Sequence, residues 1–196
     1  NASFEATTLT SNGSTDAFLT KLDSNGSISW VKQFGGTGLD VIYGISLLND
    51  DFLISGVFQN TLTLGDVSLT SSGGYDSFYA KLDSNGDTVW AKNFGGTGND
   101  GGYDIKPLSD GSSIISGNFR SNVTFGSTTL TSAGDADGFI AKLDSNGSVS
   151  WVKQFGGTNI DTLDGLTIEN DNSYLTPCYY GLSDIDNRAL MNHLET

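Results

Sequence analysis

The chain has 196 residues, which is long enough to bury a sizeable hydrophobic core, and it carries 9 Lys and Arg against 23 Asp and Glu, for a formal net charge of -14. This charge repels phosphate backbones and anionic membrane surfaces, so nucleic acid is not an expected partner. No run of 18 apolar residues occurs, which argues against insertion into a membrane. The 11 Phe, 7 Tyr and 3 Trp suit a packed core, and the 26 Gly suit an all-β protein with many tight turns.

A segment of 22 residues occurs three times along the chain. Residues 16–37 match residues 137–158 at 18 positions and residues 76–97 at 14 positions. The rest of the period repeats more loosely, with a spacing of 60 or 61 residues. The sequence therefore predicts a single repeat domain over residues 1–196. Its units are approximately 4–61, 62–122 and 123–183, and residues 184–196 begin a degenerate fourth copy.

The repeated segment predicts a β-hairpin. Along residues 28–34, the side chains Ile28, Trp30 and Phe34 fall on one face at the period of a strand. The Asp-Ser-Asn-Gly sequence before this strand ends in residues that tolerate the positive φ of a hairpin turn. The turn recurs at residues 23–26, 83–86 and 144–147.

A second hairpin follows, with strands at residues 43–48 and 52–57 joined by polar residues. Residues 62–71 add a hairpin arm, which we expect to extend outward because its Thr and Ser content suits a solvated face. Each unit thus has four core strands, and four-stranded units in tandem are the blades of a β-propeller. The expected fold class is all-β, with about three blades of four antiparallel strands, and a three-fold β-prism or trefoil is the alternative.

About three blades are too few for a propeller, which needs roughly four to eight. The start of the chain supplies the outer strands of a blade and its end supplies inner ones, so the two ends are complementary. We therefore expect a ring that is completed by another copy of the chain, as a head-to-tail oligomer with about six blades, or by neighbouring blades of a longer chain.

The pattern Asp-x-Phe-x-Ala-Lys-Leu-Asp-x-Asn-Gly, followed by Trp and by Phe-Gly-Gly-Thr-Gly-x-Asp, resembles the bacterial SBBP (seven-bladed-propeller-like) repeats. The resemblance covers nearly the whole chain, is closest over residues 76–100 and is lost over residues 161–196. It implies a secreted or cell-surface protein built from propeller blades, in which binding and scaffolding are expected rather than catalysis.

One copy of the first turn has the spacing of a calcium loop. Asp83, Asn85 and Asp87 place oxygen ligands at alternate positions. The other copies carry Ser27 and Ser148 in place of Asp87, and the distal bidentate Glu of an EF-hand is missing. Turn chemistry is therefore the favoured explanation, with calcium as the alternative, and no other cofactor is predicted.

Glycine-rich segments follow the hairpin strands, at residues 34–40 and 94–100. No helix signal or basic partner accompanies them, so they indicate connections between blades rather than phosphate cradles. Three aspartates at the ends of these segments and of the third copy are expected to cap turns: Asp40, Asp100 and Asp161.

Catalytic groups are scarce, since the one histidine, His193, lies in the degenerate last strand without a Ser or Cys nucleophile beside it. The expected function is therefore that of a non-catalytic extracellular or cell-surface module for structural scaffolding, adhesion or self-assembly. A carbohydrate-binding propeller lectin is the alternative, with glycans as partners and with Trp30, Trp90 and Trp151 as platforms if their rings are exposed. An enzyme with a site in the propeller funnel is the second alternative.

Overall fold

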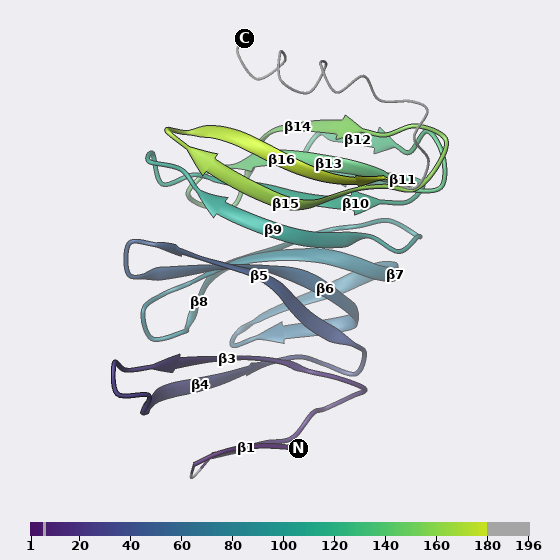
Figure 1. Ribbon diagram of the computed structural model, residues 1–196. Coiled ribbons are helices and arrows are strands. Elements are labelled where there is room, and N and C mark those ends of the chain that lie inside the picture. Colours follow the sequence, from purple (N-terminus) through teal and green to yellow (C-terminus); the bar gives the residue numbers. More distant parts are fainter. Residues whose placement is uncertain (6, 180–196) are drawn as a thin grey trace.

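The computed structural model describes residues 1–5 and 7–179, and all regular secondary structure in that range is β. The strands form antiparallel sheets that lie one on another from the N-terminal end of the chain towards its C-terminal end (Figure 1). The strands are β1 (Ala2–Phe4), β2 (Thr7–Leu9), β3 (Ala17–Leu22), β4 (Ile28–Phe34), β5 (Asp40–Leu48), β6 (Asp51–Leu64), β7 (Val67–Leu82), β8 (Thr88–Phe94), β9 (Gly101–Pro107), β10 (Ser113–Phe119), β11 (Asn122–Phe125), β12 (Thr128–Thr131), β13 (Asp137–Leu143), β14 (Val149–Phe155), β15 (Asp161–Glu169) and β16 (Asn172–Tyr179). The predicted all-β antiparallel class is confirmed.

Two sheets have four strands each, and we call them the first and second complete sheets. The first has the order β5-β6-β7-β8, and the second has the order β9-β10-β13-β14. In both sheets, each strand pairs antiparallel with its neighbours, so a sheet is a series of adjacent hairpins. This confirms the four core strands that the repeats predict.

The first and last repeats each contribute half of such a sheet within the described residues. Hairpin β3–β4 corresponds in sequence to β7–β8, and hairpin β15–β16 corresponds to β5–β6. The described strands close into no ring. Across residues 1–5 and 7–179, no helix has the length and hydrophobicity to cross a membrane. The predicted fourth copy at residues 184–196, with His193, lies outside the described residues.

The Asp-Ser-Asn-Gly turns form as predicted. Their glycines, Gly26, Gly86 and Gly147, have φ angles of 82°, 78° and 78°, which other residues rarely adopt. In the turn before β8, the N–H of Asp83 donates to Asp87 O at 2.8 Å, and the N–H of Gly86 donates to Asp83 O at 2.9 Å. The turn residues therefore set the register of each outer hairpin.

The hydrophobic core lies between consecutive sheets rather than within one of them. One cluster joins Leu53, Tyr79 and Phe94 of the first complete sheet to the second complete sheet and its arm. Its other buried members are Ile105, Ile115, Phe119, Val123, Phe125, Phe139, Ala141 and Leu143. Similar clusters join β4 to the first complete sheet through Phe34, and the second complete sheet to β15 through Leu163. Burial of apolar side chains between layers holds successive repeats together.

The first complete sheet carries a hairpin arm, formed by the continuation of β6 and β7, that folds over the preceding repeat. In this arm, Leu62 and Leu64 are fully buried, and Thr63 between them is exposed. The arm reaches the end of β4, where Gly35 and Thr63 form a bridge. The prediction that the arm extends outward is wrong, because Leu62 and Leu64 pack with Phe34 in the core. Only its polar face is solvated.

The second arm, β11–β12, repeats this arrangement against the first complete sheet. Val123 and Phe125 are buried, and the Phe125 ring stacks on Phe94 with centroids 4.6 Å apart. The arm passes so close to the preceding connection that a Cβ on Gly96 would lie 2.0 Å from Asn122 O. Each arm therefore fastens one repeat to the one before it.

Candidate functional site

The repeated tryptophans join consecutive sheets. Trp30 Nε1 donates to Ser84 O at 3.3 Å, and Trp90 Nε1 donates to Ser145 O at 3.0 Å. Each acceptor belongs to the Asp-Ser-Asn-Gly turn of the next repeat. The ring also lies against the glycine of that turn, since a Cβ on Gly86 would come 3.1 Å from Trp30 Cη2. These two partly buried rings are contacts between repeats and not free platforms for a sugar.

The calcium candidate lies in one of these turns. Asp83 Oδ1 accepts the N–H groups of Asn85 at 2.8 Å and of Asp87 at 2.9 Å. The hydrogen bond from Asp87 N–H is the main reason why the pKa of Asp83 lies below its ordinary value. The Asp87 carboxylate pairs with Lys32 of the preceding repeat at 2.8 Å. The turn interactions are present, and calcium binding by Asp83, Asn85 and Asp87 stays a prediction.

The same pair of turn hydrogen bonds occurs in the other two copies. Asp23 Oδ1 accepts the N–H of Ser27 at 2.9 Å, and Asp144 Oδ1 accepts the N–H of Ser148 at 2.8 Å. The first aspartate therefore shapes the turn whether or not a second carboxylate follows it. In the part of the chain that the structure describes, no group of three or more His, Cys, Asp and Glu residues is arranged to hold a metal ion.

The glycine-rich segments connect one sheet to the next, as predicted, and each is closed by a buried aspartate. Gly36 N–H donates to Asp40 Oδ2 at 2.8 Å, and Gly96 N–H donates to Asp100 Oδ2 at 2.7 Å. Asp161 accepts the equivalent bond at 2.8 Å in the third copy. The prediction that these aspartates cap turns is confirmed.

Two of these capping carboxyl groups are hard to ionise. Burial raises the pKa of Asp40 and that of Asp100 to about 6, although backbone N–H bonds act in the opposite direction. A second carboxylate adds to the increase in each case, because Asp16 repels Asp40 and Asp76 repels Asp100. In these two connections, a nearby second carboxylate therefore makes the capping aspartate harder to ionise.

The second carboxyl group belongs to a residue that the sequence patterns did not single out. It is Asp16, Asp76 or Asp137, the first residue of each copy of the repeated segment. Its Oδ2 accepts an amide N–H from a side chain 17 residues later, such as Gln33 at 2.6 Å. Its Oδ1 is buried without a hydrogen-bond partner in all three copies. The recurrence of Asp with Gln or Asn at this spacing is the signal that identifies it.

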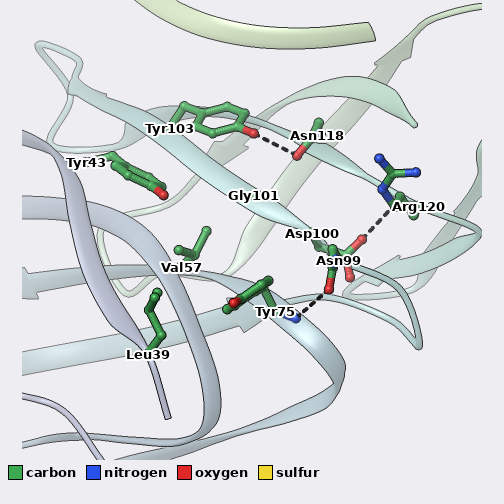
Figure 2. A pocket seen from close by; sticks show the side chains of 10 residues that line it. All are labelled: Leu39, Tyr43, Val57, Tyr75, Asn99, Asp100, Gly101, Tyr103, Asn118 and Arg120. Atoms are coloured by element: carbon green, nitrogen blue, oxygen red, sulfur yellow. Dashed lines mark hydrogen bonds between the residues drawn. The ribbon is translucent and has the colours of Figure 1, made fainter. Parts of the chain in front are cut away.

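A cavity of about 380 Å³ opens between the two complete sheets (Figure 2). Tyr43 from β5, Tyr75 from β7 and Tyr103 from β9 line it. The rings of Tyr43 and Tyr103 have centroids 5.9 Å apart and planes inclined by 41°. Amide side chains of Asn99 and Asn118 add polar groups to the wall. This combination of aromatic and polar lining is typical of small-molecule sites.

Hydrogen bonds hold these polar residues in place. The Tyr103 hydroxyl donates to Asn118 Oδ1 at 3.3 Å, and Asn99 Oδ1 accepts the N–H of Tyr75 at 3.2 Å. Burial raises the pKa of Tyr103 to about 12, so its phenol stays neutral. Arg120 also lines the cavity (Figure 2), and its guanidinium pairs with the carboxylate of Asp135, which does not line it.

Strand β3 presents an apolar edge of a different kind. Phe18 is 47% exposed and Leu22 is 54% exposed, whereas their equivalents Phe78 and Leu82 in β7 are fully buried. Phe78 and Leu82 pack in the cluster that contains Phe34 of the preceding repeat, and β7 lies between two strands, whereas β3 pairs with β4 alone among the described strands. Exposed apolar side chains on a strand with one open edge favour association with another strand.

No protein-family model matches the chain, and a search of curated proteins also finds no match.

Proposed function

We propose that the chain is a non-catalytic extracellular or cell-surface repeat module whose sheets are blades of a propeller like those of the SBBP repeats. Its proposed role is structural scaffolding through self-assembly. The observation that carries this proposal is that β3 has an open edge and that Phe18 and Leu22 on it are about half-exposed, whereas the equivalent residues Phe78 and Leu82 are buried. Four-stranded repeats that share cores with their neighbours support the propeller arrangement.

A second copy of the chain supplies the strands that the β3 edge lacks. Since β15–β16 corresponds to β5–β6 and β3–β4 corresponds to β7–β8, β16 of one copy beside β3 of another makes a four-stranded sheet. The pairing of β6 with β7 and of β10 with β13 gives the register. It places residues 173–178 of one copy opposite residues 17–22 of the other.

The tryptophan contact would be repeated at this junction. Trp151 is the equivalent of the two tryptophans that pack on the next turn. Gly86 and Gly147 each lie against such a ring, whereas the Cβ position of Gly26 is surrounded by open space. In the joined copies, Trp151 of one chain meets the turn at residues 23–26 of the other, which extends the internal contact across the junction.

Replacement of Leu22 by Lys is expected to convert a dimer into a monomer. A lysine at this position, where the equivalent Leu82 is fully buried, leaves a charge without a partner in the joined sheet, so the dimer dissociation constant should rise by about 100-fold or more. The measurement is the solution mass by size exclusion with light scattering over a series of concentrations of the full chain.

The matched control is Val89→Lys. Val89 is 55% exposed, as Leu22 is 54% exposed, but it lies on β8 of the first complete sheet, away from the β3 edge. This variant should keep the mass of the unaltered chain. A chain that is monomeric at every concentration would contradict the proposal, and so would an equal loss of assembly in both variants.

A further inference from the structure

We propose that the cavity between the two complete sheets binds a neutral saccharide, with tyrosine rings as the platform and amide and hydroxyl groups as hydrogen-bond partners. This goes beyond scaffolding, and it does not depend on self-assembly, because all the lining residues belong to one chain. The cavity volume of about 380 Å³ falls within the range of small-ligand sites and suits a mono- or disaccharide.

The aromatic part of the site is accessible. Tyr43 is 55% exposed, so about half of its surface is available to a ligand. Tyr103 lies beside it, and Tyr75 lines the same cavity (Figure 2). Rings of this kind offer flat apolar surface together with a polar hydroxyl group. They suit the apolar C–H faces and the hydroxyl edges of a pyranose ring.

Hydrogen-bonding capacity remains at the cavity wall. Asn118 and Asn99 both use Oδ1 as an acceptor within the protein, and neither Nδ2 has a hydrogen-bond partner among the described residues. The hydroxyl groups of Tyr43 and Tyr75 also have none in the described part of the chain. A ligand rich in hydroxyl groups can satisfy these donors and acceptors together, whereas an apolar ligand would leave them unpaired.

The charges around the cavity favour a neutral ligand. Arg120 is the cationic side chain of the lining, and its guanidinium pairs with Asp135. The two oxygen atoms of Asp100 accept backbone N–H bonds from Gly96 at 2.7 Å and from Arg120 at 2.8 Å, which leaves neither of them without a partner. The net charge of -14 also repels anions at long range. The lining therefore offers no free counter-charge to an ionic ligand.

The polar lining is not required by the repeat itself. Asn99 stands where the other copies have Leu39 and Ile160, and Asn118 stands where the first copy has Val57. Both differences place an amide where the repeat elsewhere has an apolar side chain, and both lie at the same cavity. Asn99 and Asn118 thus differ from the repeat pattern at the place where a polar ligand would bind.

The test uses the full chain with maltose, cellobiose, lactose, mannobiose and chitobiose as probes, measured by saturation-transfer NMR and titration calorimetry. At least one disaccharide should bind. Tyr43→Ala should weaken that binding by about tenfold or more, because it removes the exposed ring. Asn99→Leu, which restores the residue of the first copy, should weaken it by a similar factor while leaving the fold intact.

The matched control is Ile45→Ala. Ile45 lies on β5 two residues after Tyr43 and is 48% exposed, but it does not line the cavity. It should change the dissociation constant by less than about twofold, and the melting temperatures of all variants should agree with that of the unaltered chain. Leu22→Lys should bind as the unaltered chain does, which separates this proposal from that of self-assembly. The saccharide proposal is overturned if no disaccharide binds, if Ile45→Ala weakens binding as much as Tyr43→Ala, or if anionic sialyllactose binds more tightly than lactose.

Discussion

Phe125→Ala is expected to lower the free energy of unfolding by about 3–5 kcal/mol, the range for a fully buried phenylalanine. Phe125 is buried in the second arm, where its ring contacts Phe94 at 4.6 Å and Phe139 at 4.7 Å between centroids. These partners belong to different complete sheets. Truncation therefore leaves a cavity at the place where the arm fastens the two sheets together. Guanidinium denaturation, with the midpoint and the slope both recorded, measures the change.

The control for this experiment is Thr124→Ala on the opposite face of the same arm. Thr124 is exposed, and its hydroxyl group faces that of Thr129 at 3.0 Å. Its loss should cost less than about 0.5 kcal/mol, as is usual for an exposed position. If the two substitutions had equally small effects, the arm would be the solvated extension that its composition suggests, and the packing described for it would be contradicted.

The chain is expected to melt about 5–10 °C higher at pH 5 than at pH 8. Asp40 and Asp100 have pKa values of about 6 in the folded chain, against an ordinary value of 3.8. A carboxyl group with a raised pKa holds its proton more tightly when folded, so its contribution to stability is complete below 3.8 and is lost as the pH rises through about 6. Between pH 8 and pH 5, this amounts to about 1.4 kcal/mol for each group and about 3 kcal/mol for both.

Asp100→Asn separates this effect from the general charge of the chain. The amide cannot titrate, so the difference in melting temperature between pH 5 and pH 8 should become smaller, while Asp40 and Asp76, whose pKa values are also raised by burial, keep their contributions. The groups with lowered pKa values, Asp83, Asp110 and Asp171, lose their contribution only at lower pH and do not interfere in this range. Equal melting at both pH values, or an unchanged difference in Asp100→Asn, would contradict the assignment.

The hairpins and connections were predictable because their determinants are local. A turn such as that at residues 83–86 contains the Asp that accepts backbone N–H bonds and the Gly that takes positive φ. The same holds for Asp100, which caps a connection four residues after Gly96. Because the two predicted hairpins recur together at a spacing of 60 or 61 residues, the sequence also predicts units of four strands.

The direction of the arms was not predictable from their composition. Thr and Ser residues indicate a solvated surface, but Leu62 and Leu64 alternate with them and form an apolar face. That face finds its partner, Phe34, in the preceding repeat, which no local pattern reveals. The periodicity of the arm carries the correct information, and its average polarity does not.

The cavity was not predictable for a related reason. Its tyrosines and amides come from strands and connections of two different sheets, and no motif links them along the chain. The tryptophans were the more visible candidates for a sugar platform because they recur, yet Trp30 and Trp90 recur because every repeat needs them to hold the next turn. In a repeat protein, departures from the repeat deserve the search for a ligand site more than the repeated residues do.

The overlapping arms also impose an order on synthesis. Phe94 ends one sheet, and its cover, Phe125, leaves the ribosome about 30 residues later, as Leu64 follows Phe34. At a synthesis rate of about 5–20 residues per second, the phenylalanine at the end of the last strand stays uncovered for roughly 2–6 s. The most recently synthesised sheet of a nascent chain therefore lacks its covering arm for a few seconds. During that time, the near-identical arm of a neighbouring chain can pack on the sheet in place of the chain's own arm.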